Sequence, residues 1–174
     1  MRTDLSQLTA GRTWWYKRFR AAAYVNTIVW IGWTIAIVLP FPPFSYLQPI
    51  MAGGGAGTWF AIAYLLLLTV AVVGFATISS LVFVIEAHER RTLNHMVMLI
   101  GLVLLYVGMM SGLILLGLAG AVGGYALVIE NSTVSSANLL LSPFVNLITA
   151  ACLIAVVGTA FTVYGLGTAK AIES

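Results

Sequence analysis

Four long apolar stretches, separated by short polar connections, dominate the pattern of hydrophobic and polar positions along this chain. They cover about residues 21–40, 58–85, 96–125 and 142–167. A helix needs about 20 mostly apolar residues to cross the roughly 30 Å of hydrocarbon in a bilayer, and each stretch reaches that length. None of them alternates between polar and apolar residues, as the strands of a membrane barrel do. The pattern therefore predicts an all-α integral membrane protein with four transmembrane helices in a bundle.

The third stretch is longer than one upright span requires. No charged residue occurs from Met96 to Ile129, and a helix over this segment would be about 50 Å long at ~1.5 Å per residue. Four glycines occur late in it: Gly117, Gly120, Gly123 and Gly124. We expect one tilted helix that frays or bends near these glycines, before an outer loop.

The composition also indicates that the chain lies in a lipid bilayer. Hydrophobic residues make up 61% of the 174 positions and charged residues only 7%, whereas soluble domains carry about 25% charged residues. So few charges cannot cover the surface of a water-soluble domain of this size. A single cysteine, Cys152, excludes a disulfide scaffold, and a net charge of +3 on a membrane protein predicts no nucleic-acid partner.

The basic residues all fall on one side of a four-span arrangement. They are Arg2, Arg12, Lys17, Arg18, Arg20, Arg90, Arg91 and Lys170. Because Lys and Arg are in excess in cytoplasmic loops, both termini are expected in the cytoplasm, beneath a plasma membrane. The predicted organisation is a basic aromatic leader over residues 1–20, a membrane domain over 21–168 and a tail over 169–174. The residues expected to fix topology and bind lipid headgroups are Arg12, Lys17, Arg18, Arg20, Arg90 and Arg91.

The densest polar segment is the inner turn EAHERRTLNH, which begins at Glu86. His88 and His95 are its candidate cofactor ligands, because imidazole ligates haem iron. On a helix they would lie about 10 Å apart, too far to share one metal ion, and neither lies within a span. Runs of mixed charge are usually solvated. We therefore expect a solvated, charge-balanced turn with no metal and no cofactor; haem bound at the inner rim is the alternative.

Small and polar residues within the spans indicate where helices meet. GxxxG spacing, which lets helix backbones approach closely, occurs at Gly108, Gly112, Gly120 and Gly124. We expect these faces to pack helices, within the chain or against other membrane subunits. Asn26 and Asn146 lie within spans and are expected to form hydrogen bonds between helices, each contributing about 0.6 kcal/mol.

The functional expectation follows from what the spans lack. All acidic residues and both histidines lie in loops, tails or at span ends, which argues against a proton pump, a voltage sensor or an ion-coupled transporter. The chain also has no CxxC, no HExxH and no phosphate-binding loop, so no catalytic residue is predicted. We expect a non-catalytic, small hydrophobic subunit of a larger membrane complex. By analogy, its host is a respiratory or other electron-transfer assembly such as a terminal oxidase.

Two other interpretations stay open. A small homo-oligomeric transporter or channel would need polar groups at depth, and six hydroxyls could supply them: Thr69, Thr77, Ser79, Ser80, Ser111 and Thr149. A haem- or quinone-binding redox subunit would use His88 or His95, with a quinone ring near Trp30, Trp33 or Tyr106.

Overall fold

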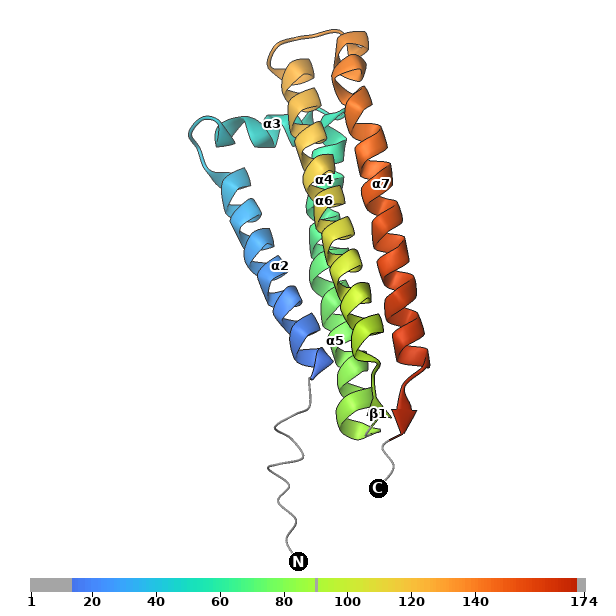
Figure 1. Cartoon of the computed structure of the whole chain (residues 1–174). Coiled ribbons are helices and arrows are strands. Elements are labelled where there is room, and N and C mark those ends of the chain that lie inside the picture. Colours follow the sequence, from blue (N-terminus) through green and yellow to red (C-terminus); the bar gives the residue numbers. More distant parts are fainter. Residues whose placement is uncertain (1–13, 90, 172–174) are drawn as a thin grey trace, which may run out of the picture.

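A computed structural model of the chain describes residues 14–89 and 91–171, and most of these are helical. Four helical segments are long and apolar enough to cross a membrane: Trp15–Val38, Gly57–His88, His95–Val128 and Val134–Gly167. They lie side by side along one common direction (Figure 1). The prediction of a multi-pass helical membrane protein with four spans is confirmed.

All four helices differ in length from the sequence prediction. The first, α2 (Trp15–Val38), begins six residues earlier than the predicted start at residue 21. The last, α7 (Val134–Gly167), begins eight residues earlier than 142 and contains Pro143. The Thr133 hydroxyl caps its first turn by accepting a hydrogen bond from the Ser136 backbone N–H at 3.3 Å. The connections after the second and third spans are therefore shorter than the hydropathy pattern suggested.

The third span, α6 (His95–Val128), is one uninterrupted helix of 34 residues. The expectation that it frays near its late glycines is wrong, because helical structure continues past Gly124 to Val128. These glycines pack against other helices of the chain, and this packing stabilises the helix where side-chain contacts are missing. Its first turn is capped by the Asn94 side chain, which accepts hydrogen bonds from the backbone N–H groups of Met96 and Val97.

The second span changes its helical winding along its length. It consists of α4 (Gly57–Leu66), the π-helical segment η2 (Leu67–Gly74), α5 (Phe75–Phe83) and a second π-helical segment, η3 (Val84–His88). A π-helix is rare and wider than an α-helix, since each N–H bonds five residues back. Both π-helical segments form hydrogen bonds with α2: the Asn26 side chain of α2 donates to η2, and the Glu86 side chain of η3 accepts from the start of α2.

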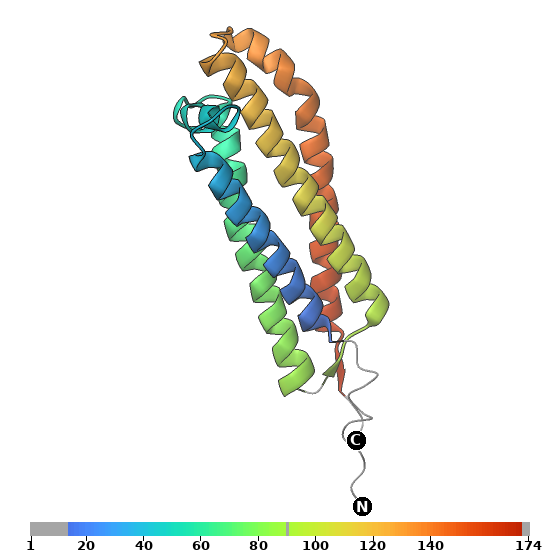
Figure 2. The ribbon, with the colours of Figure 1, turned by 90° about the vertical axis from the view of Figure 1, so that its left-hand side faces the viewer.

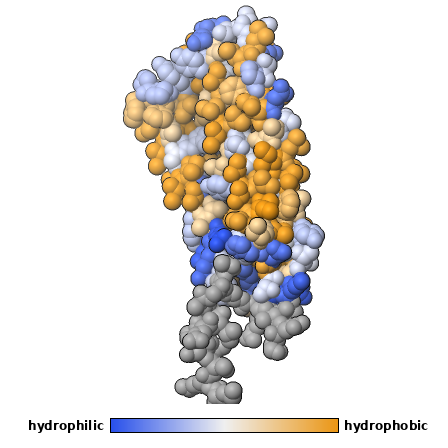
Figure 3. Space-filling model, viewed as in Figure 1, coloured by the Kyte–Doolittle hydropathy of each residue, from blue (hydrophilic) through white to orange (hydrophobic). Residues whose placement is uncertain are grey.

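The helices pack mainly with their neighbours along the chain. α7 packs on α6, the C-terminal half of α6 packs on α4, and α2 packs on η2 and α5 (Figure 2). A buried cluster joins α2, the second span and α6, with Phe19, Phe75 and Met98 among its fully buried members. Much of the remaining side-chain surface is apolar (Figure 3), as expected for helices surrounded by lipid.

The two ends of the molecule are built differently. At the end where α2 begins, β1 (Arg91–Thr92) pairs antiparallel with β2 (Lys170–Ala171), which ties the connection after the second span to the end of α7. We call this the inner end. At the opposite, outer end, the turn η1 (Phe44–Tyr46) and the short helix α3 (Leu47–Ala52) connect α2 to α4 and lie crosswise to the spans, while α6 and α7 extend beyond them (Figure 1).

Candidate functional site

The inner end holds a buried carboxylate that caps another helix. Glu86, at the end of the second span, is only 5% exposed. Its Oε1 accepts a hydrogen bond from the Trp15 backbone N–H at 3.0 Å, and its Oε2 accepts one from the Tyr16 N–H at 3.2 Å. The first N–H groups of a helix have no partner within the helix, and the positive end of the helix dipole favours an anion there. Glu86 therefore stabilises the start of α2.

Side chains around this carboxylate complete what we call the inner latch, formed by Trp15, Tyr16, Ser79 and Glu86. The Ser79 hydroxyl donates to the Tyr16 carbonyl oxygen at 2.9 Å. Trp15 is 1% exposed, and its ring lies 5.1 Å from the His95 ring, centroid to centroid. The latch thus joins the first and second spans, and Trp15 connects it to the start of α6.

Sequence reasoning missed the role of Glu86. We expected a solvated turn, and this is wrong for Glu86, although Glu89 and Arg91 do form an exposed ion pair at 3.2 Å. A signal was present, because Phe75, Ser79, Val82 and Glu86 recur at the spacing of one helix face, and all four are buried. Glu86 therefore continues the buried face of its span.

The two histidines are both exposed at the inner end. His88 ends η3 and His95 begins α6, where its ring lies against Trp15. Among residues 14–89 and 91–171, no three His, Cys, Asp or Glu side chains gather in a way that could hold a metal ion. The expected basic surface includes Lys17, Arg18 and Arg20, which are exposed on the first turns of α2, and exposed Arg91. Arg12 and Arg90 lie outside the described residues.

The aromatic residues considered for a quinone site pack against other rings. Trp30 stacks on Tyr64 with centroids 5.9 Å apart, and Trp33 lies against Phe60. Trp30 lies fifteen residues after Trp15 on α2, or about 22 Å further along the helix at ~1.5 Å per residue. It is therefore remote from the latch that His95 touches, and one ligand of ordinary size could not contact both.

The six hydroxyls considered for a pore are all engaged with backbone. Ser79 donates to Tyr16 within the inner latch. Each of the others donates to the carbonyl four residues earlier in its own span: Thr69, Thr77, Ser80, Ser111 and Thr149. Such bonds satisfy a hydroxyl within its own helix and leave it no free proton to donate. Of these six hydroxyls, that of Ser79 alone forms its bond to another span.

Asn26 forms a contact between helices at depth. It is 0% exposed, and its Nδ2 donates a hydrogen bond to the Ala71 carbonyl oxygen at 2.9 Å. Ala71 lies within the π-helical segment η2, whose winding differs from that of an α-helix. The bond joins α2 to the second span, as the sequence predicted for Asn26.

The GxxxG glycines contact other helices of the same chain. A Cβ on Gly108 would collide with the Ala155 backbone of α7, and one on Gly120 would collide with the Phe60 backbone of α4. Gly112 faces Ala151, and Gly124 faces Ile50 and Gly57, as the contacts of an added Cβ show. These positions therefore take part in intrachain packing, and Gly108 and Gly112 also line an apolar groove between η2, α6 and α7.

Asn146 is placed differently from Asn26. It is exposed on α7, and no hydrogen bond of its side chain occurs within the part of the chain that the structure describes. Its depth follows from antiparallel contacts, because Gly112 faces Ala151 and Gly123 faces Leu141, so Asn146 lies level with about Gly117. Gly117 in turn meets Trp33, five residues before α2 ends at Val38. The Asn146 amide therefore lies about 7 Å below the end of α2, at ~1.5 Å per residue.

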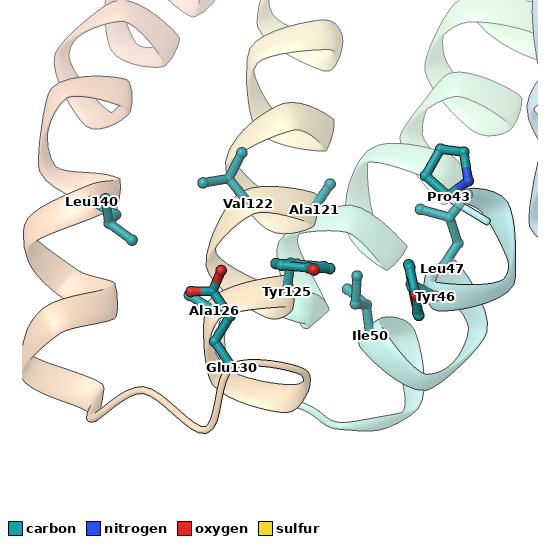
Figure 4. A pocket seen from close by; sticks show the side chains of 10 residues that line it. All are labelled: Pro43, Tyr46, Leu47, Ile50, Ala121, Val122, Tyr125, Ala126, Glu130 and Leu140. Atoms are coloured by element: carbon teal, nitrogen blue, oxygen red, sulfur yellow. The ribbon is translucent and has the colours of Figure 1, made fainter.

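A cavity of about 650 Å³ opens at the outer end. Its lining comes from η1 and the residue before it, α3, the last turns of α6 and the segment after it, and one residue of α7: Pro43, Tyr46, Leu47, Ile50, Ala121, Val122, Tyr125, Ala126, Glu130 and Leu140. Tyr125 extends from α6 toward Ile50 and Tyr46, and its ring lies 5.8 Å from that of Tyr46 (Figure 4). Glu130 is the single charged residue of this lining.

Together these features define the class of protein as a multi-pass helical membrane protein in which the buried side chains of Glu86, Ser79 and Asn26 join the first span to the second. The chain matches no family model, no curated protein and no solved structure.

Proposed function

We propose that the chain is a non-catalytic helical subunit of a larger membrane complex, docked through the face of α7 that carries Asn146. The supporting observation is the exposed Asn146 amide, which lies below the end of α2 and has no side-chain partner among residues 14–89 and 91–171. Moving an amide from water to hydrocarbon without a hydrogen bond costs about 4–8 kcal/mol. A polar group on a neighbouring transmembrane helix would satisfy it.

Further support comes from the rest of α7. This helix packs mainly on α6, so most of its circumference is available to lipid or to another protein. Leu139, Leu153 and Val156 are each more than 60% exposed along its outer surface. The hydroxyls expected for a pore are bonded to backbone, which favours the subunit over the transporter or channel.

The proposal includes a location and a class of host. The described basic residues Lys17, Arg18, Arg20, Arg91 and Lys170 share the inner end with the starts of α2 and α6. We therefore place this end in the cytoplasm, with the protein in the plasma membrane. The host to be tested first is an electron-transfer assembly, which rests on the analogy with the small hydrophobic subunits that such assemblies carry.

The test compares two asparagines of α7 by extraction in a mild detergent and sizing of the complex that contains the tagged chain. Wild type should elute with other subunits, and Asn146→Leu should weaken the association about five-fold, the effect of an interhelical hydrogen bond of ~1 kcal/mol. The matched control is Asn138→Leu, because Asn138 is also exposed on α7 but lies two turns nearer its outer end.

A stable lone monomer for wild type would refute the subunit assignment. If Asn146→Leu and Asn138→Leu both retained the full complex, docking through Asn146 would be refuted. Elution of wild type only with copies of itself would favour the homo-oligomeric transporter or channel instead.

A further inference from the structure

The outer cavity combines apolar walls with one negative charge. We propose that it binds a lipophilic ammonium ion, meaning an amphiphile with an apolar body and a single positively charged nitrogen that meets the Glu130 carboxylate. The volume of about 650 Å³ is that of a small-molecule site, since such pockets measure roughly 300–1,000 Å³. Three further properties of the site support a cationic ligand.

The first property is the charge at this end of the molecule. All eight Lys and Arg residues of the sequence occur at positions 2–20, 90–91 and 170, and both histidines belong to the inner end. Glu130 forms no ion pair among the described residues. Within residues 14–89 and 91–171, its carboxylate therefore has no cation to neutralise it, and a ligand could supply one.

The second property is the position of Glu130 in the fold. It follows the C-cap residue Ile129 of α6, and its backbone N–H donates to the Tyr125 carbonyl oxygen at 3.2 Å. The C-terminal end of a helix carries partial negative charge and favours cations. Here a carboxylate adds to that negative potential, so the local field attracts a positive group and repels an anion.

The third property is the lining itself. The Tyr46 and Tyr125 rings meet edge to face, and Tyr125 is 38% exposed, so its ring is accessible to a ligand. Aromatic rings attract ammonium groups within about 6 Å of the ring centroid. Ala121, Val122 and Leu47 provide apolar walls for an alkyl or aryl body.

The depth of the site in the membrane agrees with a ligand that has an apolar body and one charged end. Gly117 meets Trp33, and both α2 and α6 run outward, so Val122 lies level with about Val38, where α2 ends. The apolar walls therefore lie at the edge of the hydrocarbon, and Glu130 lies further out, where headgroups and water are found. The lining contains no basic residue that could meet an anionic group on the ligand, which favours a ligand whose only charge is positive.

The test uses n-octylammonium carrying a diazirine on its alkyl chain, photolysed with the full chain in lipid nanodiscs. Mass spectrometry should locate the label on the segment 121–130. Unlabelled octyltrimethylammonium should compete and octyl sulfate should not. Glu130→Gln should weaken labelling about five-fold, the effect of losing an exposed ion pair together with its contribution to the field. Glu89→Gln, at the inner end, is the matched control and should label like wild type.

A second variant tests the cavity without changing its charge. Ala121→Phe should fill the apolar wall and reduce labelling while Glu130 stays in place. Octylphosphocholine adds a negative phosphate to the same ammonium group; its failure to compete would support a ligand whose only charge is positive, whereas competition as strong as that of octyltrimethylammonium would contradict it. Equal competition by octyl sulfate, or unchanged labelling in Glu130→Gln, would overturn the proposal.

Discussion

Replacing Glu86 with alanine is expected to destabilise the start of the first span. The substitution removes two hydrogen bonds from a carboxylate, one to the Trp15 N–H and one to the Tyr16 N–H. Hydrogen bonds to charged groups contribute about 1.5–3 kcal/mol each. Both bonds belong to a residue that is 5% exposed, so water cannot readily replace them. We expect Glu86→Ala to lower the free energy of unfolding by about 3 kcal/mol, at the lower end of that sum.

Hydrogen exchange offers the most direct assay, because it reports on the capped amides themselves. With the protein in nanodiscs, the exchange rate of the Trp15 and Tyr16 amides should rise about 100-fold in Glu86→Ala, as ~3 kcal/mol implies for local opening. Glu86→Gln keeps one carbonyl oxygen as acceptor, so its effect should be smaller, about 1 kcal/mol. Unfolding by titration with sodium dodecyl sulfate gives the global value.

The control is Glu89→Ala, three residues along in the same turn. Glu89 is exposed and paired with Arg91, so its loss should change the free energy of unfolding by less than about 0.5 kcal/mol. Equal exchange rates in Glu86→Ala and wild type would refute the capping role. An equal increase in Glu89→Ala would show that general charge, rather than the cap, controls these amides.

Two further predictions concern packing and orientation. Gly108→Ala should lower the free energy of unfolding by about 2 kcal/mol, because the added Cβ would meet the backbone of α7. Gly32→Ala, where the added Cβ has no atom within 4 Å, should change it by less than about 0.5 kcal/mol. Equal values for the two variants in a sodium dodecyl sulfate titration would contradict close packing at Gly108. In a Cys152→Ala background, an impermeant maleimide added to intact cells should label Ser132→Cys and spare Thr92→Cys, and the reverse pattern would invert the predicted orientation.

The polar contacts show how much of the candidate site could be predicted from the sequence. It identified Asn26 as an interhelical donor, because an amide within a span has few other ways to be satisfied in lipid. It placed Glu86 in a solvated turn, because the charge pattern of that turn was considered without the buried face of the helix before it. It also treated Asn26 and Asn146 alike, and only the packed helices show that one is buried and the other exposed.

The sequence by itself determined the solvent, the fold class and the number of spans. An apolar stretch of about 20 residues crosses a membrane as a helix, because the helix satisfies its own backbone hydrogen bonds in lipid, whatever it packs against. Tertiary structure alone decided which helix faces meet, since a helix that is apolar on every side has no pattern in its sequence that distinguishes the buried face. It brought Glu86 to the start of α2 and assigned the glycines to α4 and α7. It also assembled the outer cavity from η1, α3, α6 and α7, which contribute residues that lie far apart in sequence.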